Sequence, residues 1–194
     1  GDSGFNENLF EKFKRESMED INSWFIGTGD YSNSFRPTIR KNMKRVLADD
    51  EEAQSELDYM IMKEMQGLAE KLSFMKGRII GLSEGHHRHD FLNGTTSTQY
   101  LCELLKTKYL GFASIVRLAF KRVKSNPSLD IFVTHGCGGS SLSSTDLANL
   151  ERKIMPYWDC DIFLRGHSTK VYAAPGAPLS YLSKPHFNNE RIKE

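Results

Sequence analysis

The chain alternates short apolar runs with longer stretches whose apolar residues recur at helical spacing, and this alternation predicts an α/β fold. Helices are expected at residues 7–23, within 49–76, at 97–109 and at 143–157, with Asp49 and Glu52 forming a capping box. Strands are expected at 24–27, 78–82, 112–123, 129–134, 161–164, 171–174 and 179–182. A hairpin through residues 125–128 adds an antiparallel pair, so the sheets should be mixed.

Length and composition are those of one globular domain spanning residues 1–194. The chain has 26 Lys and Arg against 25 Asp and Glu, so its net charge of +1 argues against a surface that is basic throughout. No apolar run approaches the ~18 residues that span a membrane, so we expect no membrane partner. Three scattered cysteines favour a reduced, cytoplasmic protein over a disulfide framework.

An Asp or a His follows four of the expected strands, each time beside a glycine. Asp30 follows the strand at 24–27, His86 and His87 follow 78–82, His135 follows 129–134, and His167 follows 161–164. In α/β sheets, ligands collect at the carboxyl ends of the strands. Glycine beside these residues lets the backbone turn sharply and come close to a ligand.

Imidazole and carboxylate together suit Zn, Mn or Fe, and one Asp with three His can complete the coordination of one divalent ion. A single His at a strand end is more often hydrogen-bonded to a backbone carbonyl, and we assign His89 and His186 to the surface on that ground. Four independent strand ends that carry ligand-type residues favour a metal site instead. The sequence therefore predicts a metal centre at this edge of the sheet.

The order of these motifs resembles that of the calcineurin-like metallophosphoesterase superfamily, and in particular its phage and bacterial phosphoesterase and nuclease-like branch. The family's motifs are Asp-x-His, Gly-Asp-x-x-Asp, Gly-Asn-His-Glu/Asp, a lone His before Gly-x-Gly-Gly, and Gly-His-x-His. The matching segments are Gly1-Asp2-Ser3-Gly4, Gly29-Asp30-Tyr31-Ser32-Asn33, Gly85-His86-His87-Arg88, His135-Gly136-Cys137-Gly138-Gly139 and Gly166-His167-Ser168-Thr169. The resemblance extends over nearly the whole chain.

The resemblance implies a four-layer α/β/β/α sandwich of two mixed sheets flanked by helices, with one or two metal ions between the loops. It implies that Asp30 bridges the ions and that Asp2 serves the first ion. His86, His135 and His167 would serve the second. His87 would be a catalytic residue that assists the leaving group.

Three departures from the family pattern change these expectations. Gly4 and Thr169 replace histidines that serve the first metal, which leaves that ion with Asp2 and Asp30. Arg88 replaces a carboxylate and is expected to be catalytic through a positive charge that a phosphate could use. The strand that precedes the first motif in the family has no counterpart in this sequence, so either that strand lies in residues outside this sequence or the domain is clipped there.

The expected function is that of a metal-dependent phosphohydrolase, which cleaves a phosphate ester or a nucleic-acid phosphodiester with metal-activated water. The alternative is a catalytically degenerate protein of the same fold that acts as a binding or assembly module. Two basic stretches, at residues 36–45 and 121–124, fit either a nucleic-acid backbone or a solvated helix face. A serine hydrolase is disfavoured, because the serines at 140–144 lack a nucleophile elbow.

Overall fold

The computed structural model describes residues 6–32, 50–121, 125–136 and 143–167, positions 39, 42, 43 and 45, and the strand backbone at 181–182 and 192–193. The chain divides into two compact units. The first holds the described parts of Gly1–Ser114 with Val133–Gly136 and Arg165–His167, and the second holds those of Ile115–Phe132, Cys137–Leu164 and Ser168–Glu194. Helices alternate with strands in two three-stranded sheets, so the predicted α/β class is confirmed.

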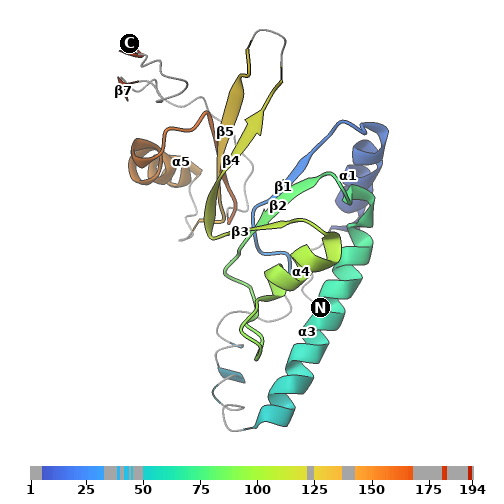
Figure 1. The fold of residues 1–194 in the computed structure, drawn as a ribbon. Helices are drawn as coiled ribbons and strands as arrows, with labels where there is room; N and C mark the ends of the chain where they lie inside the picture. Colours follow the sequence, from blue (N-terminus) through green and yellow to red (C-terminus); the bar gives the residue numbers. More distant parts are fainter. Residues whose placement is uncertain are drawn as a thin grey trace. The chain divides into compact units, whose positions relative to one another are not determined.

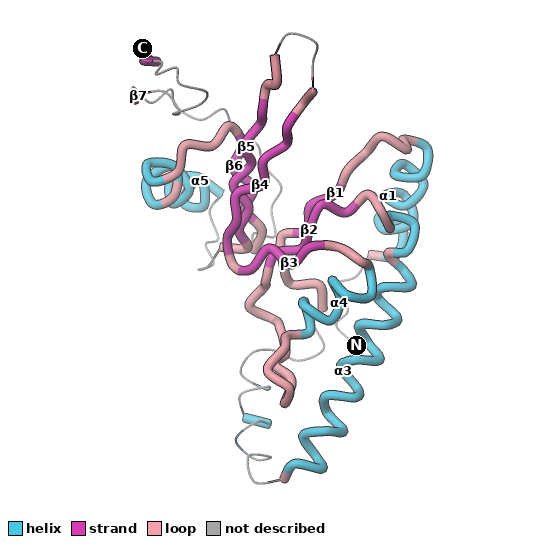
Figure 2. The backbone as a smooth tube through the Cα atoms, viewed as in Figure 1, coloured by secondary structure: helices cyan, strands magenta, loops and turns pink. Residues whose placement is uncertain are grey.

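The sheet of the first unit consists of β1 (Phe25–Gly27), β2 (Ile79–Ser83) and β3 (Lys108–Gly111), in that spatial order. Both pairs of strands are parallel. The central strand β2 is buried along almost its whole length, which accounts for its continuous apolar sequence. Because β1 and β2 are parallel neighbours, the loops that follow them leave from the same edge of the sheet (Figure 2).

Helix α1 (Glu7–Glu19) begins at the N-cap Asn6 and ends four residues before the predicted position. The carboxylate of Asp20 accepts hydrogen bonds from the Asn22 backbone and the Ser23 hydroxyl. These local bonds replace the next helical turn, as is typical of aspartate at a turn. Arg78 donates to the carbonyl of Asp20 and so fixes the helix end to the start of β2.

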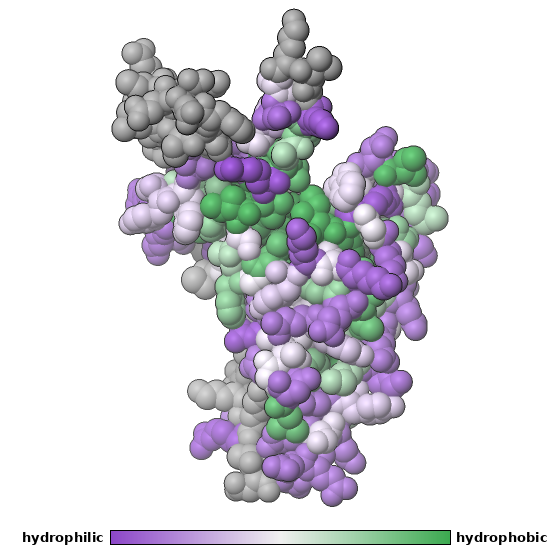
Figure 3. Space-filling model, in the orientation of Figure 1, coloured by the Kyte–Doolittle hydropathy of each residue, from purple (hydrophilic) through white to green (hydrophobic). Residues whose placement is uncertain are grey.

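Helix α3 (Glu51–Lys71) is the long helix predicted within residues 49–76, followed by a 3₁₀ turn at Ser73–Met75. The predicted cap at Asp49 is wrong: the N-cap is Asp50, whose side chain accepts from the Ala53 backbone. The buried face of α3 carries Leu57, Ile61 and Met65. Hydrophilic side chains predominate on its visible face (Figure 3), and Tyr59 and Met60 are exposed among them.

Helix α4 (Ser97–Leu105) packs against α3, β2 and β3 (Figure 1). The prediction that it continues to Tyr109 is wrong. Lys106 adopts a left-handed conformation that ends the helix, and the β-favouring residues that follow form β3 instead. The core of this unit consists mainly of residues from α3, β2 and α4, namely Leu57, Ile61, Met65, Met75, Ile79, Leu82, Phe91, Leu101, Cys102 and Leu105.

The second sheet is mixed and consists of β4 (Ala113–Ala119), β5 (Ser128–Thr134) and β6 (Ile162–Arg165), in that order. Most of this sheet belongs to the second unit, together with α5 (Ser143–Lys153) and a 3₁₀ turn at Met155–Tyr157. Arg117 of β4 donates two hydrogen bonds, of 2.7 and 2.8 Å, to the buried carboxylate of Asp130 in β5.

A two-stranded antiparallel pair joins β7 (Tyr181–Leu182) to β8 (Ile192–Lys193), and the predicted strand at 171–174 lies outside the described residues. Among the helices that the structure describes, none has both the length and the apolar character needed to cross a membrane.

Candidate metal centre

One carboxylate and three imidazoles converge at a single point in the first unit. The ligand atoms of Asp30, His86, His135 and His167 all lie within 4.8 Å of one another. Asp30 Oδ2 is 2.9 Å from His86 Nδ1 and 3.0 Å from His135 Nε2. His135 Nε2 is also 2.9 Å from His86 Nδ1 and 3.3 Å from His167 Nδ1. These four residues could hold a metal ion.

Each member of the cluster follows a strand, as the sequence analysis expected. Asp30 lies three residues after β1 and His86 three residues after β2, so the parallel pairing of these strands brings the two together. His135 comes directly after β5 and His167 two residues after β6. A hydrogen bond of 3.0 Å from the Gly166 backbone N–H to the Thr134 carbonyl joins the last two loops.

Two members of the cluster have backbone conformations that their side chains disfavour. Asp30 has a φ of +56° and His167 a φ of +65°, and within the described part of the chain Lys106 is the one other non-glycine residue with positive φ. Such conformations cost of order 1–3 kcal/mol and gather at functional sites, where surrounding contacts enforce them. The strain at two of four ligand positions therefore favours a functional role for the cluster.

Close packing of the ligand loops requires glycine at Gly85. A Cβ at this position would overlap the backbone nitrogen, the Cα and the carboxylate of Asp30. The loop after β2 can therefore approach the loop after β1 because Gly85 has no side chain. Its place directly before His86 explains how the His86 imidazole comes within hydrogen-bond distance of Asp30.

The hydrogen bond of His135 leaves its second nitrogen available to a metal. His135 Nδ1 lies 2.7 Å from the Thr28 carbonyl oxygen, which can only accept, so Nδ1 carries the proton. In the neutral ring Nε2 then presents a lone pair toward Asp30 and the other two histidines. A backbone carbonyl that orients a histidine in this way is typical of metal centres.

The spacing of the donor atoms matches that around a single ion. Bonds of about 2.0–2.1 Å imply a separation between neighbouring donors of about 3.3 Å in a tetrahedral site and about 3.0 Å in an octahedral one. Four of the six separations among these donors, from 2.9 to 3.3 Å, are close to these values, and all six are within 4.8 Å. The four donors thus lie close enough together to hold a metal ion.

The electrostatics of His86 also suit a neutral ligand. Partial burial lowers the pKa of His86 below its ordinary value, and the imidazoles of His87, His167 and His135 lower it further. The carboxylate of Asp30 opposes this effect and raises the pKa. A neutral imidazole is the form that binds a metal.

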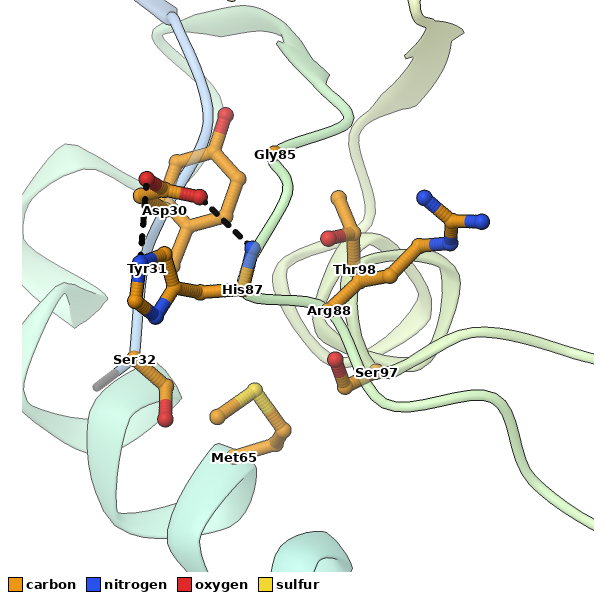
Figure 4. Close-up of a pocket in the computed structure, with 9 residues that line it drawn as sticks. All are labelled: Asp30, Tyr31, Ser32, Met65, Gly85, His87, Arg88, Ser97 and Thr98. Carbon is orange, nitrogen blue, oxygen red and sulfur yellow. Dashed lines mark hydrogen bonds and ion pairs between the residues drawn. The ribbon is translucent and has the colours of Figure 1, made fainter. Parts of the chain in front are cut away.

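Asp30 uses its two carboxylate oxygens differently. Oδ2 faces the histidine cluster, whereas Oδ1 accepts a hydrogen bond of 2.9 Å from the backbone N–H of His87. The His87 ring lies beside the same carboxylate, with Nε2 3.9 Å from Oδ2 (Figure 4). A small pocket adjoins Asp30 and is lined by Asp30, Tyr31, Ser32, Met65, Gly85, His87, Arg88, Ser97 and Thr98.

Arg88 lines this pocket, but its guanidinium points away from Asp30 (Figure 4). Its Nε donates to Asp90 at 3.0 Å, and the group lies over the Phe112 ring at 4.8 Å from the ring centre. The structure thus places His87 against the carboxylate of the cluster and Arg88 on the far side of the pocket.

The other residues named from the sequence lie mostly outside the described part of the chain. These include Asp2, Gly4, Thr169, His186 and most of the two basic stretches. Of those stretches, the described Arg45 and Lys121 are exposed.

The surface assignment of His89 is wrong. This side chain is 4% exposed and lies 2.6 Å from Asp58 of α3. The carboxylate of Asp58 also accepts from the Leu92 backbone, so α3 holds the segment that follows His86 and His87. Sequence reasoning missed this pair and also the buried Glu84, although a lone carboxylate at the end of an apolar strand is a signal that could have pointed to Glu84.

No protein-family model matches this sequence, and no curated protein or solved structure matches it significantly. The metallophosphoesterase resemblance therefore rests on the motifs of the chain itself.

Proposed function

We propose that this protein is a metal-dependent phosphohydrolase that cleaves a phosphate ester or a nucleic-acid phosphodiester. The observation that carries the proposal is the convergence of Asp30, His86, His135 and His167, whose donor atoms all lie within 4.8 Å of one another. The motif order along the chain supports the reaction class. Mn, Zn or Fe suits this mixed nitrogen and oxygen donor set.

A bound divalent ion supplies Lewis-acid chemistry, because it lowers the pKa of water toward ~7 and neutralises phosphate oxygens. Asp30 would offer Oδ2 to the ion, while its Oδ1 accepts the hydrogen bond from the His87 backbone N–H. His87 lines the pocket beside this carboxylate, where its imidazole can hold a proton for the leaving oxygen. Arg88 lines the same pocket and carries a positive charge that a bound phosphate could use.

The coordination number separates this function from the alternative of a binding or assembly module. Four protein donors saturate a tetrahedral ion, and a saturated ion has no position for water or substrate. Mn or Fe in a six-coordinate site would keep two positions open. Turnover would therefore be expected with Mn or Fe, whereas a tightly held tetrahedral Zn would favour the non-catalytic alternative.

Hydrolysis of bis-p-nitrophenyl phosphate by the purified chain in the presence of Mn²⁺ tests the proposal. We expect turnover that EDTA abolishes, and a loss of more than about 100-fold in His167→Ala and in Asp30→Asn, because each removes a metal ligand. Asp159→Asn removes an exposed carboxylate and is the matched control, with activity equal to the wild type.

Turnover and metal content, measured on the same samples, together decide between the two functions. Turnover that depends on the cluster residues supports the phosphohydrolase. One tightly bound ion with no turnover in Mn²⁺, Fe²⁺ or Zn²⁺ supports the binding module. Activity of His167→Ala equal to the wild type in all three metals would contradict the role given to that residue.

A further inference from the structure

Glu84 is a fully buried carboxylate that directly precedes the ligand loop. It is 0% exposed and accepts hydrogen bonds from three hydroxyl groups. Thr96 and Tyr109 donate to Oε2 at 2.8 Å each, and Thr98 donates to Oε1 at 2.5 Å. A buried carboxylate is costly to maintain unless hydrogen bonds satisfy it, so this arrangement calls for a reason beyond filling the core.

The hydroxyl contacts of Glu84 close the ligand loop at its base. The loop begins after Glu84, carries His86 and His87, and returns at Thr96, the N-cap of α4. One carboxylate thus joins the first residue before the loop to the first residues after it. One backbone bond adds to this closure, because Ser97 N–H donates to the His89 carbonyl at 2.8 Å. A second bond, from Glu84 N–H to the Gly111 carbonyl at 2.7 Å, ties Glu84 to β3.

We propose that Glu84 is a positioning residue of the metal centre, which holds the loop so that the His86 imidazole faces Asp30. Residues that orient metal ligands typically contribute 10–100-fold to metal affinity. This inference rests on the metal-binding part of the proposed function and not on the hydrolysis.

The test is a Co²⁺ titration of the full chain, followed by the visible absorption that reports the geometry around the ion. Glu84→Gln keeps the shape of the side chain but removes its charge and an acceptor. We expect affinity 10–100-fold weaker than that of the wild type and an altered visible band. Glu103→Gln removes the same charge from an exposed position of α4 and should match the wild type in both measurements.

A second pair of variants tests the hydroxyl contacts even if Glu84→Gln fails to fold. Thr98→Val removes the hydroxyl that donates to Oε1, and Thr98→Ser keeps it. We expect weaker Co²⁺ binding in the first and recovery in the second. A residue that serves stability alone would lower the melting temperature of both Glu84→Gln and Thr98→Val while the affinity and spectrum of the folded protein stay unchanged, and that result would overturn the proposal.

The outcomes separate this inference from the proposed function. Wild-type protein that binds no Co²⁺ refutes the metal centre and this inference together. Wild-type protein that binds Co²⁺ but hydrolyses no phosphodiester refutes the hydrolase alone, and the Glu84 variants then still decide the positioning role.

Discussion

Two glycine-to-alanine substitutions with opposite expected effects test how closely the ligand loops pack. Gly85→Ala adds a Cβ that would overlap the backbone nitrogen and Cα of Asp30, which cannot move aside as a flexible side chain can. Gly67→Ala adds the same atom within helix α3, where nothing lies within 4 Å of it. Both variants add one methyl group, which meets fixed backbone atoms at position 85 and open space at position 67.

The magnitudes follow from these surroundings. An alanine in place of a helical glycine stabilises the folded state by about 0.5–1 kcal/mol. Overpacking against fixed backbone destabilises it by about 1–3 kcal/mol. For a chain of this length, 1 kcal/mol corresponds to about 2–4 °C in Tm. Gly67→Ala should thus raise the Tm by about 2 °C, and Gly85→Ala should lower it by about 6 °C.

Thermal unfolding followed by circular dichroism, in EDTA and then with Co²⁺, measures both effects. Displacement of Asp30 in Gly85→Ala should also weaken Co²⁺ binding, whereas Gly67→Ala should bind as the wild type does. The reasoning is refuted if Gly85→Ala is as stable as Gly67→Ala and binds Co²⁺ with wild-type affinity, because Asp30 would then not depend on the missing side chain.

Three further predictions concern the core, the metal and a buried thiol. Leu101→Ala removes a side chain that is 0% exposed, and urea unfolding should show a loss of about 2–5 kcal/mol. A metal ion at 100 times its Kd should add about 2.7 kcal/mol to the free energy of unfolding, and a melting curve that EDTA does not shift back would contradict this. Burial raises the pKa of the Cys102 thiol to about 12, so at pH 8 it stays protonated. In a variant with serine at Cys137 and Cys160, Cys102 should therefore react with a thiol reagent only after unfolding.

Strong local patterns made most of the fold predictable. The apolar run of β2 and the long periodic stretch of α3 are visible in the sequence because burial acts on every residue of the strand and on one face of the helix. The helix ends were less predictable, because single contacts decide them. Asp20 ends α1 through bonds to its own neighbours, and the left-handed Lys106 ends α4 before β3.

The candidate site was predictable to the extent that its residues follow strands. Asp30, His86, His135 and His167 were each identified by a glycine and by a position after an apolar run, and the structure brings all four together. The partners of these ligands were not predictable. The Thr28 carbonyl that orients His135 is a backbone atom without a sequence signal, and the hydroxyls around Glu84 come from segments 12 to 25 residues away along the chain.

Anomalous X-ray scattering from crystals grown with Mn²⁺ or Zn²⁺ tests the central claim most directly. A single peak is predicted at about 2.0–2.3 Å from Asp30 Oδ2, His86 Nδ1, His135 Nε2 and His167 Nδ1. Well-ordered side chains at these four positions with no anomalous peak among them, in either metal, would contradict the account.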